Sequence, residues 1–184
     1  MKIKNKIYII RIPDKIHVFY CKKKKIIIIK GPINQKFFKI ETKIKIKTNT
    51  IEILFSPKSS NSLQKNLKSN QGTAAALIKQ LIIEASTIFY KKLNFIGIGY
   101  RALFIENNVL LLNLGFSHPI YFNIPINFKI FCLKLIKLFI SGNSYQNLSD
   151  ITTIIRYKKL PEPYKGKGIL HGNEKIKIKE SKKI

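Results

Sequence analysis

The densest group of residues that could bind a ligand lies near the carboxyl end of the sequence, where residues 156–168 read RYKKLPEPYKGKG. The two prolines stiffen this loop, and its two glycines let the backbone come close to a phosphate. The lysines supply positive charge, and the tyrosines offer flat faces to a base or a ribose. This pattern favours contact with RNA over the alternative, a solvated linker.

The net charge of the chain favours the same interpretation. The sequence has 184 residues with 35 Lys and Arg against 9 Asp and Glu, which gives a formal charge of +26. A chain with this surplus repels itself when compact, so it is expected to bind a polyanion. The hydrophobic fraction of 45% distinguishes the chain from a disordered basic tail. The scarcity of acids argues against a mechanism that needs a carboxylate cluster.

A second glycine motif, GIGYRA at residues 97–102, matches a dinucleotide-binding pattern. A true site needs this pattern to open a helix and an acid about 20 residues later. Here the residues that follow predict a hairpin, 103–106 and 109–112 around Asn107-Asn108, and no acid lies between Glu106 and Asp150. We therefore expect Gly97, Gly99, Tyr100 and Arg101 to serve structure or RNA contact.

The remaining reactive residues do not form a catalytic or metal-binding pattern. Ser117 and His118 are adjacent, and no carboxylate lies near them to complete a triad. The three histidines are scattered, and the two cysteines, Cys21 and Cys132, are predicted to be buried thiols. We expect no catalytic residue, no metal and no cofactor, and we keep Ser117 and His118 as possible structural or RNA-contacting residues.

Short apolar runs predict strands over most of the chain. The runs are rich in isoleucine and aromatic residues and are bounded by Pro, Gly or charge: 7–12, 16–21, 26–29, 43–47 and 51–55. The lysines at 22–25 predict a charged hairpin turn, and those at 43, 45 and 47 predict a cationic strand face that guards an edge or touches phosphate. Residues 56–70 predict an exposed loop, and the apolar spacing in 71–90 predicts an amphipathic helix.

The second half of the chain repeats this plan. A shift of 84 positions places Gly31 on Gly115, Phe38 on Phe122, Ile40 on Ile124, Ile46 on Ile130, Leu54 on Leu138 and Phe55 on Phe139. A second helix is expected at 144–156. The predicted fold is α+β, with two tandem repeats at 1–90 and 91–184. Each repeat is a mainly antiparallel sheet covered by one helix, and a basic C-terminal extension follows, with a loop and a final strand or extended tail.

Several motifs together resemble the large-subunit ribosomal protein six family of bacterial and organellar type, over nearly the whole chain. They are PEPYKGKGI at 161–169, GxGYRA at 97–102, LGFSHP at 114–119, the Gly72-Thr-Ala start of the first helix, and Glu174 with the basic tail. The resemblance implies the tandem sheet-plus-helix fold and no enzymatic activity. It also implies binding to large-subunit rRNA near the sarcin–ricin loop and the stalk base, mostly through the C-terminal repeat, in support of the translation-factor binding region.

The resemblance and the residue pattern together give the predicted RNA-binding set: Arg156, Tyr157, Lys158, Lys159, Tyr164, Lys165, Gly166, Lys167, Gly168, His171, Lys175, Lys177, Lys179, Lys182 and Lys183. Three positions depart from the family pattern, namely Asn34, the pair Leu170-His171, and Ser181. At Leu170-His171 a phosphate contact of the family is expected to be lost or moved. The expected partners are large-subunit rRNA and neighbouring ribosomal proteins, with no membrane span and no small-molecule substrate.

Composition also suggests where the protein works. The chain is rich in isoleucine and lysine, which have AT-rich codons, and its first residues predict a strand rather than a signal or transit peptide. We therefore expect an organelle-encoded protein of the mitochondrial ribosome, with a plastid or an AT-rich bacterium as alternatives. The alternative functions are an RNA-binding or chaperone module outside the ribosome, an enzyme acting on a polyanion through Glu162 and His118, and a peripheral membrane protein.

Overall fold

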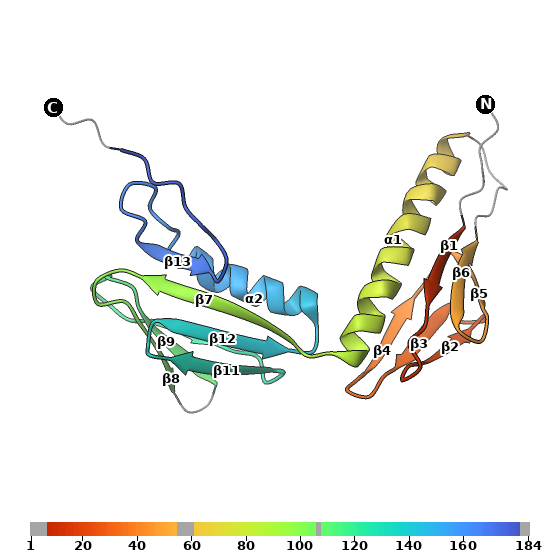
Figure 1. Ribbon diagram of the computed structural model, residues 1–184, viewed down its shortest axis with the longest axis horizontal. Helices are drawn as coiled ribbons and strands as arrows, with labels where there is room; N and C mark the ends of the chain where they lie inside the picture. Colours follow the sequence, from red (N-terminus) through yellow and green to blue (C-terminus); the bar gives the residue numbers. More distant parts are fainter. Residues whose placement is uncertain (1–6, 55–60, 106–107, 181–184) are drawn as a thin grey trace. The chain divides into compact units, whose positions relative to one another are not determined.

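The computed structural model is an α+β protein and describes residues 7–54, 61–105 and 108–180 (Figure 1). The chain divides into two compact units, Met1–Thr87 and Ile88–Ile184. Each unit contains antiparallel sheets and one long helix, so the fold class expected from the sequence is confirmed. Within the described ranges, no helix is long and apolar enough to cross a membrane.

The N-terminal unit contains two three-stranded antiparallel sheets and helix α1. Its elements are β1 (Tyr8–Arg11), β2 (His17–Cys21), β3 (Ile26–Lys30), β4 (Gln35–Lys39), β5 (Lys43–Ile46), β6 (Thr50–Leu54) and α1 (Asn61–Ser86). The sheet orders are β1-β6-β5 and β2-β3-β4. Isoleucines at alternate strand positions, such as Ile27 and Ile29, pack against Ile78 and Ile82 of α1 to form the core.

The C-terminal unit follows the same plan and adds one strand. Its elements are β7 (Phe89–Ile96), β8 (Arg101–Ile105), β9 (Val109–Asn113), β10 (Ile120–Asn123), β11 (Phe128–Leu133), β12 (Lys137–Gly142), α2 (Tyr145–Tyr157) and β13 (Gly168–His171). The sheet orders are β10-β9-β8 and β11-β12-β7-β13. Helix α2 packs on β7, β12 and β13, and it buries Leu148, Ile151 and Ile155 in the core.

The two cores correspond strand by strand. Strand β2 matches β8 and β4 matches β10 at a shift of 84 residues, which confirms the pairs Phe38/Phe122 and Ile40/Ile124. Strands β1 and β3 match β7 and β9 at a shift of 83, and β6 matches β12 at 87. Equivalent buried positions carry isoleucine in the first unit and mostly leucine in the second: Ile10/Leu93, Ile27/Leu110, Ile29/Leu112 and Ile51/Leu138.

A single shift of 84 is wrong for the hairpin that precedes each helix. Strand β5 matches β11 at a shift of 86, so Ile130 corresponds to Ile44 rather than to Ile46. Leu138 corresponds to Ile51 rather than to Leu54, and Phe55 lies outside the described residues. Two insertions in the second unit cause these changes. Five residues separate Ile124 from Ile130 where three separate Ile40 from Ile44, and the hairpin turn that follows contains one more residue than in the first unit.

The predicted bounds of the first helix are also wrong at both ends. Helix α1 already begins at Asn61, inside the stretch 56–70 that was predicted to be a loop; residues 56–60 lie outside the described part of the chain. Low helix propensity costs only a few tenths of a kcal/mol per residue, and a packed helix extends easily. At the other end, the hydroxyls of Ser86 and Thr87 and the Thr87 N–H all donate to the Ile83 carbonyl, and the helix stops before Tyr90.

The expectation that both thiols are buried needs correction. Cys21 is exposed at the end of β2 and Cys132 is half-buried, so neither thiol is fully buried. The segment after α2 was expected to be a basic loop followed by a final strand or an extended tail. Strand β13 follows the loop, and residues 172–180, which include the alternating lysines, continue it without forming a strand. The charged turn at Lys22–Lys25 is confirmed between β2 and β3, where Lys25 has a φ of 53°.

Glycine at position 31 is required by the close approach of the β3–β4 turn to the end of α1. A Cβ atom at Gly31 would lie 2.2 Å from the Ala85 carbonyl oxygen, which also accepts the Ile33 N–H. We expect Gly31→Ala to lower the free energy of unfolding of the N-terminal unit by about 1–3 kcal/mol because backbone must move. Urea denaturation followed by circular dichroism measures this loss.

Gly72→Ala is the matched control, because Gly72 lies within α1 and the nearest atom to its added Cβ, the Tyr8 hydroxyl, is 3.7 Å away. It should raise the free energy of unfolding by about 0.5–1 kcal/mol through helix propensity. Equal effects of the two substitutions would contradict the close approach at Gly31.

Candidate RNA-binding surface

The basic stretch singled out in the sequence forms an internally hydrogen-bonded loop between α2 and β13, here called the α2–β13 loop (residues 158–167). The Ile169 N–H donates to the Lys159 carbonyl at 3.0 Å, and the Glu162 N–H donates to the Lys167 carbonyl at 2.9 Å. The Gly166 N–H donates to the Glu162 carbonyl at 2.8 Å. These bonds hold the two arms of the loop together, so its lysines project from a defined backbone.

Two glycines set the shape of this loop. Gly166 has a φ of +67°, a conformation that side-chain-bearing residues rarely adopt. At Gly168 an added Cβ would lie 2.5 Å from the Pro161 Cα, so the start of β13 packs directly on the backbone of the opposite arm. Both glycines therefore determine where the neighbouring lysines lie.

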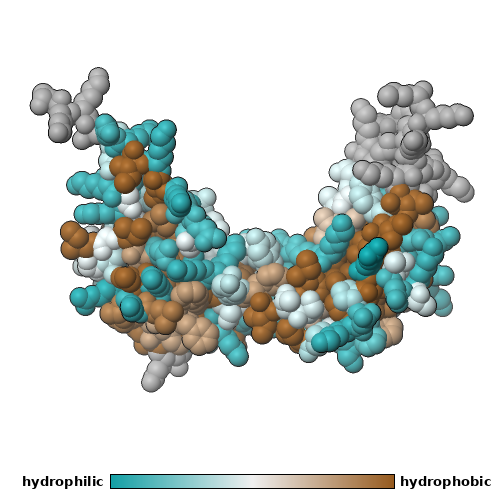
Figure 2. All heavy atoms as spheres, in the orientation of Figure 1, coloured by the Kyte–Doolittle hydropathy of each residue, from teal (hydrophilic) through white to brown (hydrophobic). Residues whose placement is uncertain are grey.

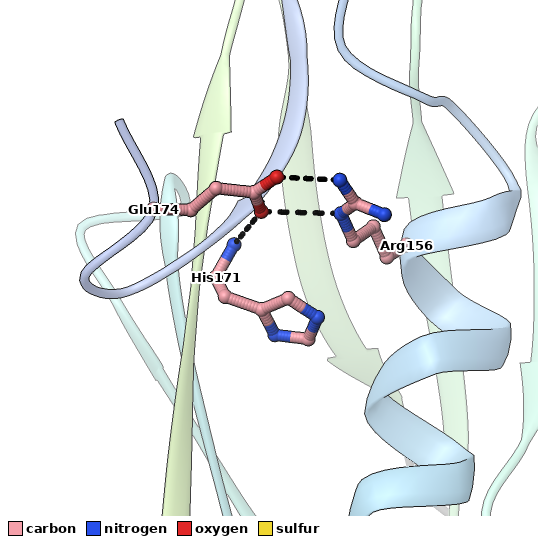
Figure 3. A network of polar contacts seen from close by, with 3 residues as sticks. All are labelled: Arg156, His171 and Glu174. Atoms are coloured by element: carbon pink, nitrogen blue, oxygen red, sulfur yellow. Dashed lines mark hydrogen bonds and ion pairs between the residues drawn. The ribbon is translucent and has the colours of Figure 1, made fainter. Parts of the chain in front are cut away.

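An ion pair fixes the base of the loop (Figure 3). The Arg156 guanidinium, near the end of α2, donates two hydrogen bonds to the two carboxylate oxygens of Glu174, one of them 3.2 Å long from Nε. The same carboxylate accepts the His171 backbone N–H at 3.1 Å. Glu174 thus joins the end of α2 to the end of β13, and Arg156 is occupied by this contact.

The contacts of Glu174 alter the acidity of this group and of its neighbour. Burial of Glu174 by itself would raise the pKa of the carboxyl, but the hydrogen bonds from His171 and Arg156 and the charge of Arg156 outweigh it, and the pKa lies below its ordinary value. Burial lowers the pKa of His171, with Arg156 and Lys91 acting in the same direction and Glu174 in the opposite one. Low pKa values favour a charged Glu174 and a neutral His171.

Three loops meet at one end of the C-terminal unit. The Lys159 ammonium lies 4.3 Å from the centre of the Phe116 ring, which stacks on the His118 ring at 6.2 Å. Gly168 pairs with Ile96, the last residue of β7, so the turn at 97–100 begins beside the α2–β13 loop. The structure therefore brings the three sequence motifs at 97–102, 114–119 and 161–169 to the same region.

The glycine motif at 97–100 has a structural explanation. The buried Tyr100 ring would lie 2.8 Å from a Cβ at Gly97 and 3.1 Å from a Cβ at Gly115. Gly99 has a φ of +74° in the turn between β7 and β8, and the exposed Arg101 follows Tyr100. Gly97 and Gly115 provide space for an aromatic ring that holds two loops together.

The side chains that could meet a ligand are exposed. Tyr157 and Tyr164 are 66% and 53% exposed, Lys158 and Lys165 are exposed, and Lys167 is half-buried. Ser117 and His118 are also exposed in the neighbouring loop. Figure 2 shows hydrophilic side chains, with apolar ones between them, over the visible surface of the C-terminal unit.

The basic tail follows the loop closely at one point. The Lys179 N–H donates to the Pro163 carbonyl at 3.0 Å, so part of the tail returns to the α2–β13 loop. Lys175, Lys177 and Lys179 are exposed on this segment, whereas Lys182 and Lys183 lie outside the described residues.

The sequence-based set omitted Phe116. This residue stands inside the motif at 114–119, but its role depends on the contact with Lys159, which lies 43 positions later in the chain. Only the folded structure shows that the two loops meet.

Measurements of stability at acidic pH test the ion pair between Arg156 and Glu174. The folded-state pKa of Glu174 is lowered, so its stabilising contribution is full above the unfolded value of about 4.3 and disappears as pH falls through the lower folded value. We expect Glu174→Gln to lower the free energy of unfolding by about 1 kcal/mol at pH 7, a modest loss because the pair is partly exposed to water. The loss should be smaller at pH 3, because protonation of Glu174 weakens the ion pair in the unaltered protein. Urea unfolding of both proteins across this range gives the difference, and a loss that does not depend on pH would contradict the ion pair.

Comparison with known proteins gives the family. No family model matches the chain. A curated protein of Mycoplasmoides gallisepticum is 36% identical over 174 residues, 95% of this chain and 93% of its own length. Proteins of Histophilus somni and Haemophilus influenzae are 34% and 33% identical over 155 residues, 84% of this chain and 85% of their own. All three are named large ribosomal subunit protein uL6, and identity of this extent confirms the resemblance carried by the motifs: the chain belongs to the uL6 family of large ribosomal subunit proteins, which are structural components and not enzymes.

Proposed function

We propose that this structural protein of the large ribosomal subunit binds large-subunit rRNA through the loop end of its C-terminal unit. The observation that carries the proposal is the meeting of three loops there, with exposed lysines and tyrosines held on a hydrogen-bonded backbone. By the family resemblance, the rRNA contacted lies near the sarcin–ricin loop and the stalk base. The protein would support the translation-factor binding region by position, without chemistry of its own.

Charge provides most of the affinity in this proposal. The α2–β13 loop contains four lysines, at 158, 159, 165 and 167, and one acid, Glu162. The nearby Glu174 is neutralised by Arg156, so it subtracts little from the positive field of the loop. Lysines that neutralise phosphates release condensed counterions, and this release favours binding at low salt.

Shape provides the specificity. A-form RNA has a deep, narrow major groove that side chains cannot read, so a protein recognises the backbone and the shape of such helices. A loop fixed by its own hydrogen bonds and by Gly166 and Gly168 presents its cations in one arrangement. Tyr157 and Tyr164 can stack on unpaired bases or pack on riboses at the edge of this contact.

The predicted binding residues divide into two roles. Lys158, Lys165, Lys167 and the exposed tail lysines are proposed to contact phosphate directly. Arg156, Gly166, Gly168 and His171 are proposed to act through the shape of the loop, because Arg156 is paired with Glu174 and burial favours neutral His171. Lys159 is proposed to act mainly through its cation–π contact with the Phe116 ring, which links the loop to the neighbouring motif.

The proposed partners are rRNA and neighbouring ribosomal proteins. The relatives named above are bacterial, so they support the AT-rich bacterium and give no support to the mitochondrial ribosome that was expected from composition. The genome that carries the gene, and the genetic code it uses, decide between mitochondrion, plastid and bacterium.

Co-sedimentation in high magnesium separates the ribosomal role from an RNA-binding or chaperone module outside the ribosome. A stoichiometric amount of the protein in purified large subunits, retained through a salt wash, is the expected result. A pool that is mostly free and exchanges rapidly would favour the alternative.

Salt titration tests the loop itself. The double variant Lys165→Ala/Lys167→Ala should bind a large-subunit rRNA fragment more weakly, because two phosphate contacts are lost. The slope of log affinity against log salt concentration should become shallower by about 1.4–1.8. Filter binding across a salt series measures both quantities.

The charge-matched control is Lys23→Ala/Lys24→Ala, which removes two exposed lysines from the β2–β3 turn of the N-terminal unit. Its slope should equal that of the unaltered protein. If the loop variant keeps the original slope, the phosphate contacts lie elsewhere on the chain.

A further inference from the structure

The N-terminal unit contains a groove between two strands that each form the edge of a sheet, here called the β2–β5 groove. The orders β1-β6-β5 and β2-β3-β4 leave one side of β5 and one side of β2 without a neighbouring strand (Figure 1). The groove has a volume of about 470 Å³. Its lining residues are Val18, Phe19, Tyr20, Lys22, Ile44, Lys45, Ile46 and Lys47. Among the residues that the structure describes, no backbone hydrogen bond joins β2 to β5.

The C-terminal unit closes the equivalent gap with its own atoms. There β8 and β11 correspond to β2 and β5, and the two strands are in contact. The Ala102 N–H donates to the Leu135 carbonyl at 2.7 Å, and the Phe104 backbone hydrogen-bonds to the Cys132 thiol. Leu135, whose φ is 59°, lies in the β11–β12 turn, and this turn contains one more residue than the β5–β6 turn of the first unit.

The comparison shows which groups of the N-terminal unit face the groove. Val18 and Tyr20 occupy the positions of Ala102 and Phe104, so their N–H groups point from β2 toward β5. No acceptor for either N–H lies among the described residues, although both residues are half-buried. Backbone donors that are shielded from water normally find an acceptor, and these two are in position to meet one on a bound molecule.

The side chains that line the groove are apolar on its floor and cationic at its rim. Ile44 is buried and Ile46 is partly exposed, while Lys22 and Lys45 are exposed at the rim with no carboxylate among the lining residues. In the C-terminal unit the positions of Lys45 and Lys47 hold Phe131 and Leu133, so the cationic rim belongs to the first unit alone. Lys47 pairs with Glu52, which leaves Lys22 and Lys45 as the exposed cations of the rim.

We propose that the β2–β5 groove binds an extended segment of an acidic protein by addition of a strand to β2. The backbone carbonyls of the segment accept the N–H groups of Val18 and Tyr20, in the way that peptides bind to sheet edges. Alternate apolar side chains rest on Val18, Ile44 and Ile46, and the carboxylates between them meet Lys22 and Lys45. An RNA strand satisfies the lysines but offers neither the regular row of carbonyls nor the apolar side chains that this floor accommodates.

Binding to the full-length protein tests the proposal. The probe is a fluorescent peptide of alternating valine and glutamate with blocked ends, and the readout is fluorescence anisotropy. We expect saturable binding, and protection of the Val18 and Tyr20 amides from hydrogen exchange when the peptide is present. A peptide of alternating valine and lysine should bind at least about tenfold more weakly because its charge matches that of the rim.

Two alterations separate the backbone contribution from the charge contribution. Two versions of the peptide carry methyl groups on alternate backbone nitrogens, one version for each register, and the protein itself is unchanged. The version whose methyl groups face β2 should lose binding, and the other version should keep it. Lys45→Glu should weaken binding of the unmodified peptide about fivefold, while Lys24→Glu, an exposed lysine outside the groove, should leave it unchanged.

Three results would overturn the proposal. One is equal affinity for the methylated peptides in both registers. Another is an equal response to Lys45→Glu and Lys24→Glu. The third is tight binding of oligouridylate that weakens with Lys45→Glu while the acidic peptide does not bind, which would assign the groove to RNA. None of these outcomes depends on the α2–β13 loop, so the proposal can fail while the rRNA contact of the C-terminal unit stands.

Discussion

Electrostatic repulsion is the constraint that the rest of this structure must satisfy. A formal charge of +26 on 184 residues opposes any compact state, and within the described residues only three ion pairs offset it. Two of these join elements distant in the chain: Lys36 with Glu84 in the N-terminal unit, and Arg156 with Glu174 in the C-terminal unit. The cohesion of each unit therefore comes from its apolar core, and most cations remain at the surface for external anions.

The few acids are placed where they organise the fold. Glu84 is buried near the end of α1 and also accepts a hydrogen bond from Gln80, and Glu174 joins α2 to β13. A carboxylate in such a position stabilises a local arrangement and lowers the local positive charge only slightly. The chain thus keeps its positive field while retaining the polar contacts that define the base of the α2–β13 loop.

Much of the architecture follows from local sequence patterns. Alternating isoleucines and turn residues predicted most strands, and the spacing of Leu148, Ile151 and Ile155 predicted α2 to within one residue. Errors arose where local preference and tertiary structure differ, as at Asn61, where a polar stretch continues a packed helix. The tandem repeat was visible in the sequence, but its changing shift was not, because extra residues in the connections between strands alter the shift without changing the hydrophobic pattern. The candidate site shows the same division: its lysines and glycines stand in recognisable motifs, whereas the contact of Lys159 with Phe116 and the pairing of Arg156 with Glu174 depend on distant segments.

The exchange of isoleucine for leucine between the two cores has a practical consequence for spectroscopy. Every buried leucine among the described residues, from Leu93 to Leu170, belongs to the C-terminal unit, whereas the strands of the N-terminal unit bury isoleucine alone. Selective carbon-13 labelling of leucine methyl groups would therefore report mainly on the interior of the C-terminal unit, and Leu81, which packs against the N-terminal core, would add a signal from the other unit. The duplicated halves thus contain natural probes for following the melting or assembly of each half separately.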